Sequence, residues 1–419
     1  MKTRATKGKV LFVLLCIMGM FSACASQEIL QEAPVTFQLD GEELLEKTID
    51  DFLSEKDSEG LGEDNVDELQ DESFLMSEIY PYAFQSLDEK EQAWYKDIEQ
   101  CLGKMSEGVT LDKTALREGL TEEDINLIFQ CVLMDHPELF YVEGYTYTLY
   151  TRGNATVSIE FAGTYNVDVD TAREKKRQIE IAAEEILSQV ANLENDYDKM
   201  KAIYETIILN TDYEVGAADN QNIYSVFVNG RSVCQGYAKA TQYLCNMAGI
   251  ECTLVMGTVD DGMGHAWNLV NLDDDFYYVD TTWGDVSYDM TEGQSQDVYT
   301  PEINYDYLCI TTRKLSVTHT IDTQIPVPEC ISLDNNYYVR ENAYFTEYNR
   351  EQMATVFQRM YEQGKRDVTI MCSDVNCYEM VERQLLDEQE IFNYLAGHES
   401  VGFSLSPDQL SMTFWMTNE

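Results

Sequence analysis

A cysteine, a histidine and an aspartate follow one another within one short stretch of this 419-residue chain, and this order constrains the fold more than any other feature. Cys234 starts a helical pattern, His265 starts a run typical of a strand, and Asp280 lies in the next such run. A cysteine enzyme that transfers acyl groups needs a thiol, an imidazole and a carboxylate together. The chain has four histidines, so the position of His265 is informative. We therefore expect a fold in which the start of one helix meets two strands.

The helix predicted from Cys234 to Gly249 places the thiol in its first turn. Ser232 is the expected N-cap, and Gly249 suits the C′ position. The positive end of a helix dipole stabilises a thiolate, and the free N–H groups there can bind a developing oxyanion. Gly236 and Ala238 would let the backbone lie close to the reacting atoms. This local structure favours Cys234 as a nucleophile over a buried helix cysteine.

The register of the strands decides whether His265 and Asp280 can meet. Three strands are expected after the helix: residues 250–256, 265–272 and 276–282. If the turn at Asp273–Asp275 makes an even-length loop, Trp267 faces Asp280 and His265 faces Thr282. His265 and Asp280 then share one face as diagonal neighbours, roughly 6–8 Å apart at the backbone. A slip of one residue would put them on opposite faces, so the triad prediction depends on this register.

Three short motifs carry a resemblance to a known family. They read Val-Cys-Gln-Gly-Tyr-Ala at 233–238, His-Ala-Trp-Asn at 265–268 and Val-Asp-Thr-Thr-Trp at 279–283. Over about residues 195–310 the chain resembles the transglutaminase-like superfamily, most of all its bacterial secreted branch. The resemblance implies a papain-like α+β core with Cys234 as nucleophile, His265 as the group that takes and returns the proton, and Asp280 as its orienting carboxylate.

The resemblance implies acyl transfer without choosing the acceptor. Water as acceptor gives a protease, amidase or deamidase, whereas an amine gives crosslinking. Hydrolysis of a peptide or peptidoglycan-type amide is favoured, because no calcium-loop pattern of the animal crosslinking enzymes is present and hydrolysis needs no second substrate site. The alternative is a catalytically retired binding or assembly module on the same fold. No cofactor is expected, and the lack of a CxxC pair argues against a structural zinc site.

Three aromatic residues are candidates for the substrate cleft: Trp267, Trp283 and Tyr224. Either tryptophan could instead pack the sheet. Upstream, Asp135-His136-Pro137-Glu138-Leu139-Phe140 resembles a segment often found before the core in these bacterial proteins. That segment breaks a helix and adds little about chemistry.

The N-terminal residues have the pattern of a secretory signal. Basic residues precede an apolar run from Val10 to Phe21, too short to span a bilayer permanently. The following Ser22-Ala23-Cys24 resembles a bacterial lipobox, although Phe21 stands where leucine is usual. We expect cleavage before Cys24 and lipid on its thiol, which makes the protein an extracytoplasmic, membrane-anchored bacterial lipoprotein. An ordinary signal peptide with an incidental cysteine is the alternative.

The formal net charge of −48 limits the possible partners. It would repel nucleic acid and anionic lipid, so we expect the membrane to be reached through the N-terminal lipid. The resemblance implies a protein or peptide substrate, with a peptidoglycan peptide among the candidates. Of the eleven cysteines, Cys16 lies in the signal and Cys24 would be lipidated. The odd number that remains has no regular spacing, which excludes a disulfide scaffold.

The expected fold class is α+β, with an N-terminal α+β unit before the core and a C-terminal α/β unit after it. In the C-terminal unit, residues 337–339 and 343–345 are predicted strands. Five segments are expected: a lipoprotein signal peptide at 1–23, an acidic and mostly disordered tether at 24–75, an N-terminal domain at 76–170, a catalytic domain at 171–322 and a C-terminal domain at 323–419.

Overall fold

The chain folds into two compact units, Met1–Arg177 and Gln178–Glu419, and each mixes helices with sheets. The computed structural model describes residues 36–38, 81–153, 155–260, 262–286, 301–395 and 400–416. The predicted signal peptide, Cys24 and nearly all of the predicted tether lie outside these residues. Every helix within them is too short or too polar to cross a bilayer. The mixture of elements agrees with the predicted α+β class.

The first unit is built on a four-stranded sheet in the order β1-β3-β4-β2. Its elements are β1 (Thr36–Gln38), α2 (Tyr82–Ser86), α3 (Glu89–Gly103), β2 (Val109–Thr110), α4 (Lys113–Arg117), α5 (Ile125–Asp135), β3 (Val142–Arg152) and β4 (Ala155–Tyr165). The long strands β3 and β4 form an antiparallel hairpin. Phe129 of α5 packs on Tyr145 and Phe161 of this hairpin, with ring centroids 4.7 and 6.3 Å away.

The upstream Asp-His-Pro-Glu segment has a structural place in the first unit. The buried carboxylate of Asp135 accepts N–H bonds of 2.9 Å from both Ala83 and Phe84, in the first turn of α2. The hydroxyl of Tyr95 donates to the same carboxylate at 2.9 Å. Burial raises the pKa of Asp135 to about 6, although the three hydrogen bonds to its carboxylate lower that pKa. Asp135 thus ties the end of α5 to α2 and α3.

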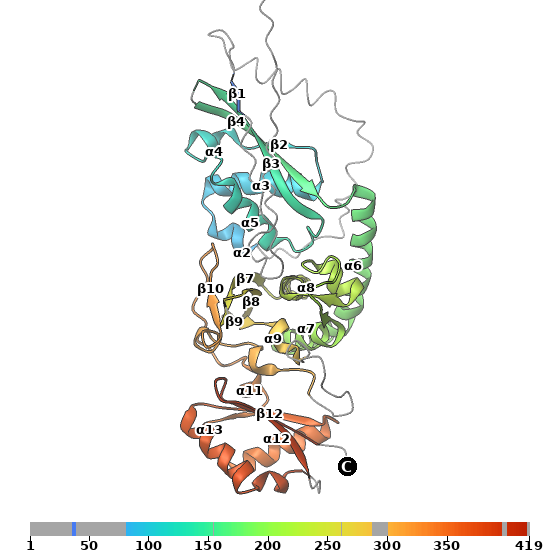
Figure 1. Cartoon of the computed structure of the whole chain (residues 1–419), viewed down its shortest axis with the longest axis vertical. Helices are drawn as coiled ribbons and strands as arrows, with labels where there is room; N and C mark the ends of the chain where they lie inside the picture. The colour runs from blue at the N-terminus through green and yellow to red at the C-terminus, as the bar shows by residue number, and fades with distance from the viewer. Residues whose placement is uncertain are drawn as a thin grey trace, which may run out of the picture. The chain divides into compact units, whose positions relative to one another are not determined.

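The second unit contains the predicted catalytic block, and its main sheet has the antiparallel order β10-β7-β8-β9. Its elements are α6 (Val169–Val190, which crosses the boundary between the units), α7 (Asp196–Asn210), β5 (Asp212–Tyr213), η2 (Ser225–Asn229), β6 (Arg231–Ser232), α8 (Cys234–Met247), β7 (Cys252–Val259), β8 (Gly264–Leu272), β9 (Asp275–Val279), α9 (Thr281–Gly284), η4 (Tyr305–Tyr307), α10 (Thr312–Leu315) and β10 (His319–Ile321). The buried helix α8 packs on β7 and β8 (Figure 1).

A second sheet, in the order β11-β12-β14-β13, ends the chain within the same unit. Its elements are α11 (Tyr337–Arg340), β11 (Tyr344–Phe345), α12 (Arg350–Glu362), β12 (Asp367–Cys372), α13 (Val375–Glu382), η5 (Arg383–Asp387), η6 (Glu390–Asn393), β13 (Val401–Ser406) and β14 (Ser411–Met416). Figure 1 shows α12 and α13 on one face of this sheet. The strand predicted at 337–339 is wrong: Asn336 accepts the N–H of Tyr338 at 3.1 Å and starts a helical turn there.

The predicted register of the β8–β9 hairpin is confirmed. Asn268 pairs with Val279 and Leu272 pairs with Asp275, so the next pair outward would be Trp267 with Asp280. The predicted strand end at Thr282 is wrong, because β9 stops at Val279. Asp280 caps the short helix α9 instead.

The start of α8 also differs from the prediction in one respect. Cys234 is its first residue, but the N-cap is Val233, which makes no side-chain capping bond. The hydroxyl of Ser232 turns away and lies 2.8 Å from the carbonyl of Asn220. At the other end Gly249 has a φ of +82°, as a C′ residue requires.

Candidate active site

Cys234 differs from the other cysteines of the described residues in exposure. These residues hold nine cysteines, all free, and Cys234 is partly exposed whereas the other eight are buried. The N–H groups in the first turn of an α-helix lack acceptors within the helix. Since Cys234 is the first residue of α8, its thiol lies at a helix N-terminus, where these backbone donors and the helix dipole favour negative charge.

A close contact beneath the first turn of α8 explains why glycine stands at position 236. A Cβ added to Gly236 would lie 2.0 Å from Oγ of Ser232 and 3.0 Å from the carbonyl of Asn220. The Ser232 hydroxyl also lies 2.7 Å from the hydroxyl of Ser225. The loop before the nucleophile thus packs directly against the helix backbone, and this contact fixes where the helix begins.

Buried polar contacts hold α8 against β8, which carries His265, and against α9, which Asp280 caps. The side-chain amide of Asn268, in β8, donates to the carbonyl of Ala238 at 2.9 Å. The hydroxyls of Thr241 and Thr281 lie 3.1 Å apart and join α8 to α9. Because each contact is buried, the helix and the hairpin are locked in one relative position.

His265 links the thiol to Asp280. Its Nε2 lies 2.7 Å from Oδ2 of Asp280, and both side chains are buried. A carboxylate can only accept, so Nε2 carries the hydrogen and Nδ1 remains for the thiol of Cys234, which also contributes to the raised pKa of this imidazole. Burial disfavours the charged imidazole, but Asp280 outweighs it and raises the pKa of His265 to about 10.

The carboxylate of Asp280 is held by four donors. Oδ1 accepts the N–H groups of Thr282 at 2.9 Å and Trp283 at 3.1 Å. Oδ2 faces His265 and, at 3.1 Å, Nε2 of His319. Although burial opposes ionisation, the two imidazoles hold the pKa of Asp280 well below its ordinary range. Asp280 is thus a buried carboxylate that stays charged.

His319 is the residue that the sequence analysis missed. It lies 39 positions after Asp280, outside the three motifs, on the edge strand β10. Its ring is buried and packs 4.7 Å from Trp283 and 5.0 Å from Trp267 between ring centroids. The scarcity of histidine was the one signal in the sequence that could have drawn attention to it.

His265, Asp280 and His319 also have the composition of a metal-ligand set, with candidate ligand atoms within 4.8 Å of one another. Zinc bonds of about 2.0–2.2 Å in a tetrahedral arrangement place ligand atoms roughly 3.3 Å apart. The 2.7 Å contact between His265 and Asp280 is shorter and has the length of a charge-assisted hydrogen bond. We therefore interpret the cluster as hydrogen-bonded, and the absence of a metal from the reaction stays a prediction.

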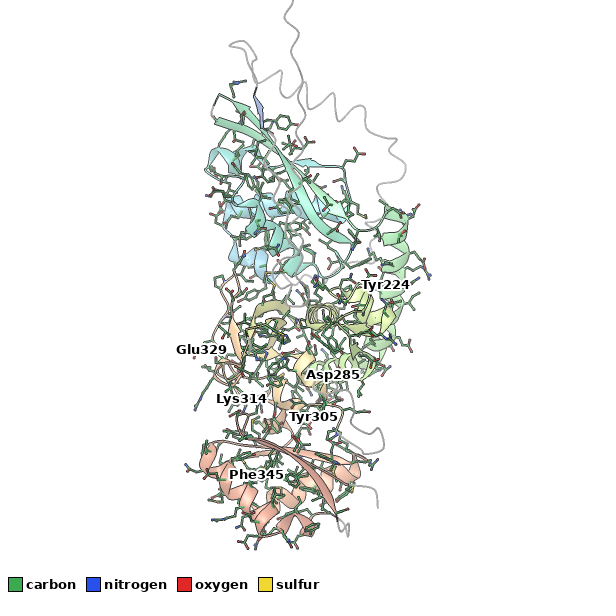
Figure 2. All side chains as sticks on the ribbon, viewed as in Figure 1. Tyr224, Asp285, Tyr305, Lys314, Glu329 and Phe345 are labelled. Carbon is green, nitrogen blue, oxygen red and sulfur yellow. The ribbon has the colours of Figure 1, made fainter. Side chains whose placement is uncertain are left out.

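The three candidates for the substrate cleft differ in their surroundings. Trp267 is fully buried and stacks on His265 at 5.9 Å, so it packs the interior. Trp283 is partly exposed, with its ring 6.0 Å from that of His265. Tyr224, which is labelled in Figure 2, donates a hydrogen bond of 2.9 Å to the side chain of Gln178 in α6. Trp283 is therefore the candidate that best combines exposure with a contact to His265.

Comparison with known proteins agrees with this geometry. Residues 184–281 match the Transglutaminase-like superfamily. Kyphoscoliosis peptidase of Mus musculus is 28% identical over 122 residues, which cover 25% of this chain and 18% of the mouse protein. The Homo sapiens protein of the same name is 28% identical over 106 residues, covering 21% and 16%. This chain thus matches less than a fifth of the length of either relative.

Solved structures with a similar fold include a TGase, with 18% identity, a TM-score of 0.25 and coverage of 36% of this chain and 46% of the other. The periplasmic domain of TgpA from Pseudomonas aeruginosa has 15% identity, a TM-score of 0.20 and coverage of 31% and 55%. Cys234, His265 and Asp280 all lie within residues 184–281, the part of this chain that matches the Transglutaminase-like superfamily.

Proposed function

We propose that this protein is a cysteine-dependent acyl-transfer enzyme that hydrolyses amide bonds in peptides or peptidoglycan-type substrates. One observation carries the proposal: Nε2 of the buried His265 lies 2.7 Å from the buried carboxylate of Asp280, and the partly exposed Cys234 at the start of α8 interacts electrostatically with the same imidazole. Each of the three groups has the surroundings that its role requires.

The reaction follows from these positions. The thiolate of Cys234 attacks the acyl carbon, and the N–H groups at the start of α8 stabilise the oxyanion that forms. Protonated His265 gives its proton from Nδ1 to the leaving amine, which leaves a thioester on Cys234. The same imidazole then takes a proton from water as the water attacks the thioester. The acid is released, the proton returns to the thiol and imidazole pair, and the enzyme is restored.

Asp280 stabilises the charged imidazole through both steps. The contact of its carboxylate with Nε2 of His265 fixes the tautomer that directs Nδ1 toward the thiol. A neutral amide at this position would keep the shape but lose the charge that holds the proton on His265. The carboxylate is therefore expected to affect turnover more than substrate binding.

Water is favoured as the acyl acceptor because the sequence has no calcium-loop pattern of the animal crosslinking enzymes and because hydrolysis needs no second substrate site. A direct test incubates the full chain, in detergent, with peptidoglycan fragments and a glutamine-containing peptide library, with and without a fluorescent primary amine. Mass spectrometry should detect products with one amide hydrolysed, and Cys234→Ala should remove them. Incorporation of the amine at the expense of hydrolysis would contradict the preference for water. Products that persist in Cys234→Ala would contradict the mechanism.

Membrane anchoring through Cys24 is a separate part of the proposal, supported by the lipobox-like sequence. The mature protein should partition into the detergent phase and incorporate labelled fatty acid during growth. Cys24→Ser should abolish both, while Cys16→Ser, inside the signal, should leave both unchanged. Fatty acid incorporation that survives in Cys24→Ser would show that the anchor is elsewhere.

A further inference from the structure

The second histidine on Asp280 is placed by a close approach between two strands. β10 pairs with β7, so that Ile321 faces Gly257 and His319 faces Val259. A Cβ added to Gly257 would lie 2.0 Å from the carbonyl of Thr320. Glycine at this position therefore lets β10 approach closely enough to bring the ring of His319 beside the buried carboxylate.

The ring of His319 is fixed on both nitrogens. Nδ1 lies 2.8 Å from the hydroxyl of Thr318, which can donate to it. Nε2 lies 3.1 Å from Oδ2 of Asp280, and since a carboxylate only accepts, this nitrogen carries a hydrogen. Three aromatic rings pack against the imidazole and restrict its rotation: Trp267, Trp283 and Tyr307.

These contacts give each oxygen of Asp280 a pair of donors. The two backbone N–H groups both donate to Oδ1. Without His319, Oδ2 would therefore have His265 as its one donor. The N–H of His319 completes the pair at Oδ2. The carboxylate therefore presents Oδ2 to His265 from one fixed orientation.

We infer that His319 is a positioning residue, which fixes the carboxylate of Asp280 and, through it, the imidazole of His265 in the orientation that activates Cys234. The inference rests on the proposed function, since it concerns the same thiol. A positioning role requires the N–H donor at Nε2, whereas a packing role requires only the ring. A positioning role also requires that the effect of His319 on the thiol depends on Asp280.

Matched substitutions separate the donor from the ring. Glutamine and methionine are similar in length, but only the glutamine amide can donate to Asp280, whereas phenylalanine keeps an aromatic ring without the donor. The readout is the second-order rate of alkylation of Cys234 by iodoacetamide in the full chain, with far-UV circular dichroism to check folding. His319→Met and His319→Phe should slow the reaction about 10- to 100-fold, the range for one hydrogen bond to a charged group. His319→Gln should recover most of the rate.

A double-mutant comparison tests the path through Asp280. In an Asp280→Asn background, His319→Met should slow alkylation by less than about twofold, because the group that it orients is already lost. Equal slowing in both backgrounds would overturn the inference in favour of packing. So would a His319→Gln rate as low as that of His319→Met.

A spectroscopic signature tests the contact without using reactivity. The chain has four histidines, so nitrogen-15 labelling of histidine gives few ring signals. One protonated Nε2 signal should disappear in His319→Gln and shift in Asp280→Asn. A His319 signal that is unmoved in Asp280→Asn would overturn the inference. If Cys234 does not react in the wild type, the proposed function fails. If it reacts in the wild type but the His319 variants do not behave as predicted, only the inference about His319 fails.

Discussion

Nε2 of His265 lies 2.7 Å from Oδ2 of Asp280, and both side chains are buried. This contact sets the tautomer of the imidazole, directs the other ring nitrogen to the thiol and, together with His319, keeps the carboxylate charged. The chemistry and the stability of this part of the fold therefore depend on the same pair.

Replacing Asp280 with asparagine should reduce turnover with little change in KM. The amide can donate to His265 and so favour the wrong tautomer, and it no longer stabilises the charged imidazole. We expect kcat to fall by roughly 10²–10⁴-fold, the range for losing the orienting carboxylate of a triad. Steady-state kinetics on the substrate identified for the wild type would measure this. Asp275→Asn, at the exposed start of β9, is the control and should leave kcat unchanged.

The same substitution should reveal a pH-dependent loss of stability. The folded pKa of His265, about 10, lies above its ordinary 6.5, so the stabilisation from pairing is full below 6.5 and is lost as the pH rises through about 10. The pKa of Asp280 is lowered, so its contribution is present above the ordinary 3.8 and lost only in strong acid. Asp280→Asn should cost about 3–5 kcal/mol near neutral pH.

Urea unfolding at several pH values would test that prediction. The difference in unfolding free energy between wild type and Asp280→Asn should shrink as the pH is raised from neutral toward 10. A difference that stays constant over this range would mean that the pair does not change its ionisation there. Asp275→Asn again provides the control for a general effect of charge.

The register of the β8–β9 hairpin shows how much of the site could be predicted from sequence. The period of two along the strands places His265 and Asp280 on one face only if the hairpin loop has an even number of residues, and the sequence left that number open. In the structure Leu272 pairs with Asp275, so the loop has two residues and the condition is met. The start of α8 at Cys234 could likewise be predicted from local pattern. These features depend on residues close together in the chain, where sequence rules are strongest.

What the sequence could not give depends on contacts between distant residues. Ser232 looked like an N-cap, but its hydroxyl is used by the loop at Asn220, 12 residues earlier. Asp280 looked like a strand residue, but its carboxylate caps α9. His319 reaches Asp280 because β10 pairs with β7 across the sheet, which no local pattern indicates.

Substituting alanine for Gly236 should disturb the nucleophile without touching the triad. The new Cβ would lie 2.0 Å from Oγ of Ser232, so the first turn of α8 must shift. We expect a loss of about 1–3 kcal/mol of stability and slower alkylation of Cys234. Adding Ser232→Ala removes the worst contact and should recover part of both losses. Gly216→Ala, where a Cβ meets nothing within 4 Å, should be close to neutral.

Asp135→Ala should affect stability and spare reactivity. It removes the acceptor for two N–H groups at the start of α2 and for the hydroxyl of Tyr95. We expect a loss of about 1–3 kcal/mol in chemical denaturation, the cost of leaving buried donors unsatisfied. Alkylation of Cys234 in the folded protein should be unchanged. Slower alkylation in the folded variant would give the Asp-His-Pro-Glu segment a part in the chemistry.

The rate of alkylation of Cys234 by iodoacetamide in mild acid, at about pH 5.5, tests the central claim most directly. Peptide mass spectrometry can compare Cys234 with Cys330 in the same molecules, where burial raises the pKa of the Cys330 thiol to about 12. Cys234 should react on the order of 10² times faster than Cys330, and His265→Ala should slow it at least about tenfold while the fold is retained. A Cys234 that does not react in the folded wild type, or that reacts equally fast in His265→Ala, would contradict the account.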